Sequence, residues 1–98
     1  MAEKALKLLA HRAHAASSFN RAAIETGARC GCFYCVKVFS PKETPIKEWI
    51  DYQRTALCPF CSIDSVVSSA DIEKVTEVGF LKLMEAKWFG DLNEESHA

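Results

Sequence analysis

Two short motifs, Cys32-Phe-Tyr-Cys35 and Cys58-Pro-Phe-Cys61, hold four of the five cysteines of this 98-residue chain. A Cys-x-x-Cys turn presents two thiolates on one side of a tight loop, and two such turns supply the four ligands of a tetrahedral zinc ion. The 22 residues between the motifs exceed the usual spacing of about 15 to 20 residues, but the longer connection costs only a fraction of a kcal/mol. We therefore predict a zinc site whose ligands are Cys32, Cys35, Cys58 and Cys61.

The same cysteines have other possible uses. Two disulfides would imply an oxidising compartment, but the first ten residues mix charged and apolar residues and form no apolar signal segment, so we expect a cytoplasmic protein. A thioredoxin-like redox pair would need one Cys-x-x-Cys at the start of a helix in a βαβ unit, and two pairs in so short a chain argue against it. Iron stays open as an alternative to zinc.

Cys30 is the fifth cysteine and lies just before the first motif. Two residues separate Cys32 from Cys35, and this spacing lets both sulfurs reach one ion with amide donors behind them. Cys30 does not have this spacing to Cys35. We predict that Cys30 is a buried or reserve thiol outside the metal site.

The composition, 49% hydrophobic and 26% charged, is typical of a globular protein, and the length fits one domain. No apolar run is long enough to span a bilayer. We divide the single domain into a helical N-terminal segment (1–27), a zinc lobe (28–68), a C-terminal helix (69–90) and a polar tail (91–98).

The predicted fold class is α+β, a small zinc-ribbon-like core with flanking α-helices. Apolar residues at helical spacing predict helices at 3–16, 21–26 and 76–89, and a capping-box pattern from Ser40 to Glu43 predicts another that ends near Gln53 after restarting at Thr44 or Pro45. Each Cys-x-x-Cys motif is predicted to lie on a hairpin, the first within 30–39 and the second between strands at 55–58 and 63–67.

Several other polar or aromatic residues are candidates for function. His11 and His14 have a spacing that allows both to approach one ligand, although we favour solvated or capping roles. Asn20 is a candidate helix cap. Asp64 is a candidate for a turn hydrogen bond or, less favoured, a catalytic role. Trp49 is interpreted as a core residue over the zinc lobe rather than as a platform for a ligand.

The net charge of −1 hides an asymmetry between the two halves of the chain. Through Lys42 there are seven basic and two acidic residues, a balance of +5, and from Glu43 onward five basic and eleven acidic residues, a balance of −6. We interpret the basic first half as a working face for a partner, with Arg29 and Lys37 also offsetting the charge of the thiolates.

A set of motifs resembles a family of small bacterial cytoplasmic proteins whose reaction is not established. The resemblance covers about residues 18–90 and includes the segments beginning at Asn20, Cys30, Trp49, Ala56 and Ile63. It implies zinc at the four motif cysteines. Ser62 stands where a zinc knuckle would carry Gly, and Phe19 stands where relatives carry His.

Three function classes are compatible with these features. We favour a structural-zinc module that binds a protein partner or a second copy of itself, because four thiolates leave no open coordination position. A nucleic-acid-binding zinc ribbon is the alternative, with bases stacking on Phe33 and Tyr34 beside the basic residues. A relative of treble-clef nucleases is least favoured, since only Asn20 and the two histidines suggest it. We predict no catalytic residues.

Overall fold

The computed structural model describes residues 2–90, with side chains from residue 4 onward. Its helices are α1 (Ala2–Ala15), α2 (Arg21–Ile24) and α3 (Val78–Glu85), with a 3₁₀ turn η1 (Glu73–Thr76) before α3 and a π-helical turn η2 (Ala86–Gly90) after it. Its strands are β1 (Cys30–Cys32), β2 (Lys37–Phe39), β3 (Trp49–Ile50), β4 (Thr55–Ala56) and β5 (Val66–Ser68). The α+β class is confirmed, and the predicted polar tail lies outside the described residues.

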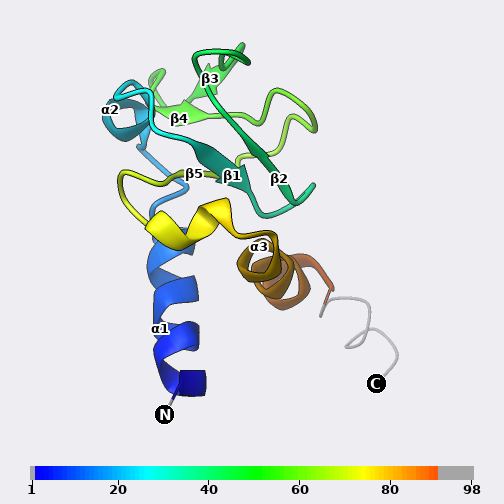
Figure 1. Cartoon of the computed structure of the whole chain (residues 1–98). Helices are drawn as coiled ribbons and strands as arrows, with labels where there is room; N and C mark the ends of the chain where they lie inside the picture. Colours follow the sequence, from blue (N-terminus) through cyan, green and yellow to red (C-terminus); the bar gives the residue numbers. More distant parts are fainter. Residues whose placement is uncertain (1, 91–98) are drawn as a thin grey trace.

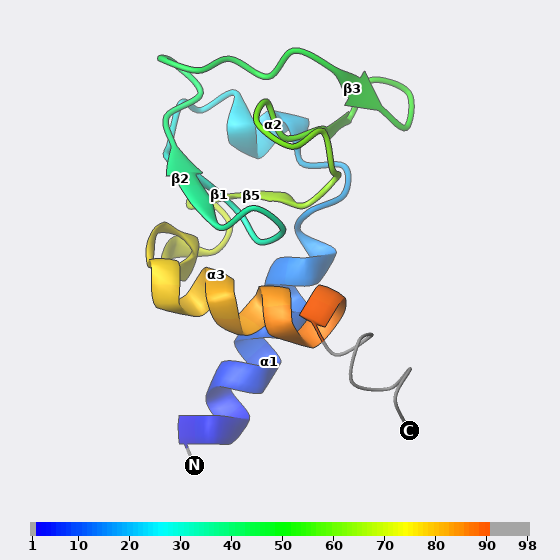
Figure 2. The same ribbon diagram turned by 90° about the vertical axis from the view of Figure 1, so that its right-hand side faces the viewer.

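The strands form two small antiparallel sheets. One has the order β2-β1-β5, and β3 and β4 form the other. In Figures 1 and 2, α1 and α3 lie on one side of the three-stranded sheet, and α2 and the β3–β4 hairpin lie on the other. None of the described helices has the length and apolar character needed to cross a membrane.

The two faces of the three-stranded sheet belong to two different cores. Successive side chains of a strand point to opposite faces, so Cys30, Cys32 and Val66 pack with Ile24 toward α2, whereas Val67 packs toward the helices. The helical core also contains Ala10 and Ala13 of α1, Val75 of η1, and Phe80, Leu81 and Met84 of α3. The apolar residues at helical spacing in the first and last helices thus pack into this core, in which Leu6, Leu9, Ala16 and Trp88 are partly buried.

Gly31 lies in β1 on the face covered by η1 and α3. A Cβ atom there would collide with the Val75 carbonyl oxygen and lie 3.0 Å and 3.1 Å from the two methyl groups of Leu81. The small residue therefore sets how closely η1 and α3 approach the sheet.

Replacing Gly31 with alanine is expected to lower the free energy of unfolding by about 1–3 kcal/mol, because the backbone of η1 has to shift. Gly79→Ala is the matched control, since its new Cβ would meet no atom within 4 Å and alanine favours a helix. Chemical denaturation would measure both changes. Equal effects of the two substitutions would contradict this account of Gly31.

The predicted helix ending near Gln53 is wrong. Ser40 starts only a single turn, in which its carbonyl oxygen accepts hydrogen bonds from the amides of Glu43 and Thr44. Pro45 disfavours the helical conformation at residue 44 and supplies no amide hydrogen. The segment then becomes β3, which pairs with β4 through a tight loop at 51–54.

The second Cys-x-x-Cys motif was predicted to lie on a hairpin of two paired strands, and this prediction is wrong. The strand before it, β4, pairs with β3, and the strand after it, β5, pairs with β1, with Cys32 opposite Val66. The first motif does join a β-hairpin, β1–β2, as predicted. This β1–β5 pairing brings the two motifs together.

Asn20 does not cap α2 with its side chain. It is buried, and its Nδ2 donates to the Val66 carbonyl oxygen at 2.7 Å while its Oδ1 accepts from the Ala56 amide at 3.2 Å. Asn20 therefore bridges the two sheets across the lobe that contains the cysteines. This structural role removes one of the features that suggested a nuclease relative.

Candidate metal centre

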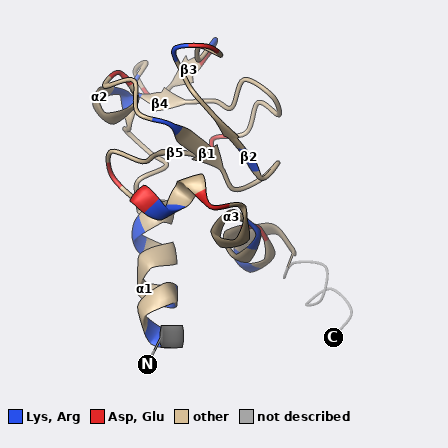
Figure 3. Cartoon of the chain, in the orientation of Figure 1, with Lys and Arg blue, Asp and Glu red and all other residues tan. Residues whose placement is uncertain are grey.

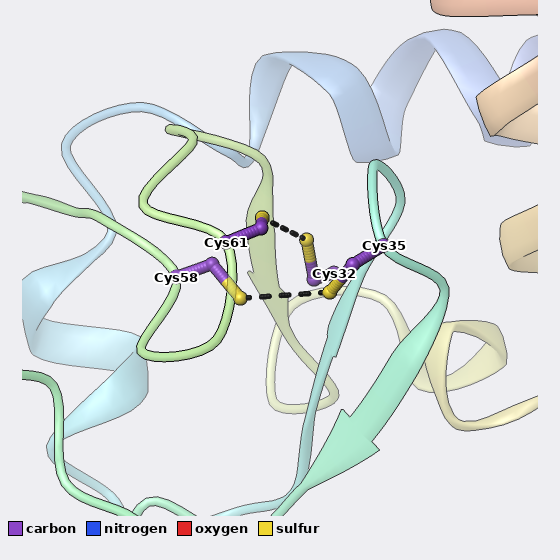
Figure 4. A group of neighbouring side chains, drawn as sticks. All are labelled: Cys32, Cys35, Cys58 and Cys61. Carbon is purple, nitrogen blue, oxygen red and sulfur yellow. Dashed lines mark hydrogen bonds between the residues drawn. The ribbon is translucent and has the colours of Figure 1, made fainter.

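The sulfurs of Cys32, Cys35, Cys58 and Cys61 all lie within 4.8 Å of one another. The Sγ atoms of Cys32 and Cys61 are 3.7 Å apart, and those of Cys35 and Cys58 are 3.8 Å apart (Figure 4). A tetrahedral ion with bonds of about 2.3 Å to sulfur requires sulfur–sulfur distances of about 3.8 Å. All five cysteines of the chain are free thiols, and the four in this cluster could hold a metal ion.

Backbone amides support the first cysteine of each motif. The Phe60 amide donates to the Cys58 sulfur at 3.4 Å, and the amides of Phe60 and Cys61 lower the pKa of Cys58. The amides of Cys35 and Tyr34 likewise lower the pKa of Cys32. The two motifs therefore form the same local structure, in which amide donors stabilise negative charge on a sulfur.

The residue after each motif has a left-handed backbone. Val36 has φ of +61° and Ser62 has φ of +66°. This conformation lets the chain turn back behind the second cysteine, and it favours glycine over residues with a side chain. The sequence expectation of a glycine at position 62 is thus explained by the backbone that Ser62 adopts.

Replacing Ser62 with glycine is expected to raise the free energy of unfolding by about 0.5–1 kcal/mol, because Ser62 is exposed and has a positive φ. Ser69→Gly is the control, since Ser69 has no positive φ and glycine there adds only unfolded-state entropy. Thermal denaturation would compare the variants. Destabilisation by Ser62→Gly would show that the serine side chain contributes more than the strain costs.

Cys32, Cys35 and Cys58 do not ionise alike. The side chain of Cys58 lowers the pKa of Cys32 to about 5, assisted by Ser65 and by the amides of Cys35 and Tyr34. The same contact with Cys32 raises the pKa of Cys58 well above its ordinary value, and burial raises the pKa of Cys35 to about 11. A divalent cation bound by four thiolates has to displace the remaining protons, so its affinity falls as the pH is lowered.

The sequence placed Ser65, with Asp64, among the polar residues beside the metal but gave it no role. Its hydroxyl lies 3.1 Å from the Cys32 sulfur, and its carbonyl oxygen accepts the Phe33 amide at 3.1 Å. The residue is buried with 1% of its surface exposed. Its contact with Cys32 was not predicted, because it depends on the pairing of β5 with β1.

Cys30 lies outside the cluster, in agreement with the prediction that it is a buried thiol. It is fully buried in β1, its sulfur lies 3.6 Å from the Ala28 carbonyl oxygen, and burial raises its pKa to about 11. Two residues along a strand span about 6.6 Å. Cys30 and Cys32 therefore face the same side of the sheet at different positions.

His11 and His14 pack against an aromatic side chain and do not join the cysteines. The His14 ring stacks on Trp88 with centroids 4.4 Å apart, and His11 meets the same indole edge-on at 5.5 Å. Phe33, from the first cysteine motif, lies between His14 and Phe89, with centroids 5.8 Å from each. This aromatic cluster joins α1 and η2 to the motif.

The charged and aromatic residues named beside the motifs have mixed roles. Phe33 is buried, so it offers no face to a base, whereas Tyr34 is exposed and touches Phe89 edge-on. The Lys37 ammonium lies 4.6 Å from the centre of the Phe60 ring, beside the second motif. Asp64 and Arg29 are both exposed.

No family model, curated protein or solved structure matches this chain. Its function is therefore inferred from the chemistry of its own residues.

Proposed function

We propose that the four clustered cysteines hold one structural zinc ion in a zinc-ribbon-like core, and that the protein is a cytoplasmic binding module. The observation that carries the proposal is the convergence of two Cys-x-x-Cys motifs with sulfur–sulfur distances of 3.7 Å and 3.8 Å. Four sulfur ligands and no open position are typical of structural rather than catalytic zinc. We also propose that the chain is related to the family of small bacterial cytoplasmic proteins that its motifs resemble.

The partner that we propose is a protein, or a second copy of this chain. Phe19 has 62% of its surface exposed and Tyr52 has 92%, and both residues have a positive φ, which is costly for bulky residues. Arg54, which is also exposed, follows Tyr52 by two residues and lines the same surface hollow as Phe19, and its carbonyl oxygen accepts the amide of Arg21. Exposed aromatic and arginine side chains are enriched in protein interfaces.

Binding to nucleic acid is less well supported. The basic residues are spread over several elements in Figure 3, with acidic residues among them. Arg21 already pairs with Glu25 at 2.8 Å, and the buried ring of Phe33 cannot stack on a base.

Metal analysis of the purified protein tests the first part of this proposal, and one zinc ion per chain is the expected result. Iron in its place would contradict zinc, and a folded protein without metal would contradict the structural site.

Sedimentation at increasing protein concentration, with a Phe19→Ser, Tyr52→Ser double variant, tests self-association. RNA and DNA binding measured at two salt concentrations tests the nucleic-acid alternative. A steep loss of affinity with salt would favour that alternative over a protein partner.

A further inference from the structure

A groove of about 320 Å³ lies between α2 and the segment 41–49, on a part of the surface that the cysteines do not form. Its lining exposes polar and apolar surface in about equal parts, and the apolar side chains include Ile24, Ile46 and Trp49, together with two prolines, Pro41 and Pro45. The volume is at the lower end of the range of small-molecule sites. It is large enough for one side chain or a small organic molecule.

Arg21 forms one charged wall of the groove and is held in place. Its guanidinium lies 4.4 Å from the centre of the Trp49 ring, its Nε donates to Glu25, and its Nη1 donates to the Gln53 carbonyl oxygen at 3.0 Å. These contacts leave the N–H groups of Nη2 for a ligand. A pre-positioned guanidinium loses little entropy on binding an anion.

Lys42 is the second basic residue that lines the groove. Its side chain crosses Gly27, which has φ of +87° and whose missing Cβ leaves the space that the lysine stem occupies. The two salt bridges among the residues that the structure describes are Arg21–Glu25 and Lys74–Glu77, so no carboxylate of that part of the chain pairs with Lys42. The ammonium is therefore available to a ligand in the groove.

We infer that this groove binds a carboxylate with an apolar body, of the size of one amino-acid residue. Arg21 and Lys42 supply two positive charges and Glu25 supplies one negative charge, so the lining carries a net charge of +1. That charge matches a monoanion, and Glu25 would repel the second charge of a phosphate. The ligand class includes an N-acyl amino acid and the C-terminal residue of a peptide.

Nuclear magnetic resonance of the full-length protein can test this inference, with the Trp49 indole and Gly27 amide signals as reporters. The probe is N-acetyl-phenylalanine, and N-acetyl-phenylalaninamide and phenyl phosphate are its neutral and dianionic counterparts. We expect saturable shifts with the carboxylate at a dissociation constant on the order of 1 mM, as befits so small a ligand. A tripeptide that ends in phenylalanine distinguishes the two ligands, because a site for the C-terminal residue of a peptide would bind the tripeptide at least as tightly as N-acetyl-phenylalanine.

Substitution of Lys42 separates charge recognition from apolar contact. Lys42→Gln is expected to weaken binding of the carboxylate by about fivefold and to leave that of the amide unchanged. Lys47→Gln is the matched control, because Lys47 is exposed and does not line the groove. The inference is overturned if no probe gives saturable shifts, if amide or phosphate binds as tightly as the carboxylate, or if Lys42→Gln has no effect. The metal content of the same sample is measured as well, so that absence of carboxylate binding is not mistaken for absence of zinc.

Discussion

Replacement of Cys58 by serine is expected to abolish stoichiometric zinc binding and to unfold the lobe that contains the cysteines. Cys58 is buried and its sulfur lies 3.8 Å from that of Cys35, so the loss of its thiolate removes one of four ligands. Structural zinc supplies on the order of 10 kcal/mol of apparent binding free energy in small domains, which is comparable with the whole stability of a protein of this size. Metal content per chain and the melting temperature would measure the effect.

Cys30→Ser is the matched control for this prediction. The substitution also replaces a buried thiol with a hydroxyl, but outside the cluster, so one zinc ion per chain should remain while stability falls by about 1–2 kcal/mol. Loss of the metal in Cys30→Ser together with its retention in Cys32→Ser would reverse the ligand assignment. Retention of a full equivalent of zinc in Cys58→Ser would contradict a four-cysteine site.

Removal of the metal by a chelator is the second change with a large expected effect. We expect amide hydrogen exchange to lose protection in β1, β2, β4 and β5, while α1 and α3 keep part of theirs. The core on the α2 side of the sheet contains Cys30, Cys32 and Cys58, whereas the core on the helical side contains no cysteine and is built from aliphatic and aromatic residues. The first core therefore depends on the metal more strongly than the second.

The aromatic cluster determines how far this loss spreads. Phe33, within the first motif, packs against Trp88 with centroids 6.0 Å apart, so unfolding of the motif should also loosen η2. Amide exchange followed by mass spectrometry would map the change, and chelator added to metal-free Cys58→Ser should produce no further change. Full protection after chelation would show that the fold does not need a metal.

Local patterns predicted the helices at both ends of the described chain, and the structure places them close to the expected residues. The apolar steps in α1 and α3 identify their buried faces, because helical periodicity depends only on nearby residues. Gly31 was expected to let the backbone turn, but it lies within β1. The aromatic and β-branched residues around the first motif favour strands, so the motif was predicted to lie on a hairpin. β1 and β2 confirm that expectation.

The same reasoning failed for the segment around Trp49. Ile46, Trp49 and Ile50 have the spacing of a helical stripe, but the spacing does not exclude a strand with a short partner nearby. The left-handed conformations of Asp51, Tyr52 and Gln53 allow a tight hairpin instead. A non-glycine residue in this conformation leaves no clear sequence signal, so a helix was predicted in place of β3, whereas the strand predicted at 55–58 contains β4.

Local spacing was enough to identify which cysteines could act as ligands, since two residues between thiolates is a constraint that holds in any fold. It also determined that Cys30 does not fit that spacing. Tertiary structure decided that the two motifs meet, through the pairing of β1 with β5. It also made Asn20 a bridge between the sheets and placed Ser65 beside Cys32. Hydrogen bonds between residues more than 30 positions apart depend on the path of the whole chain, and local residue patterns do not encode that path.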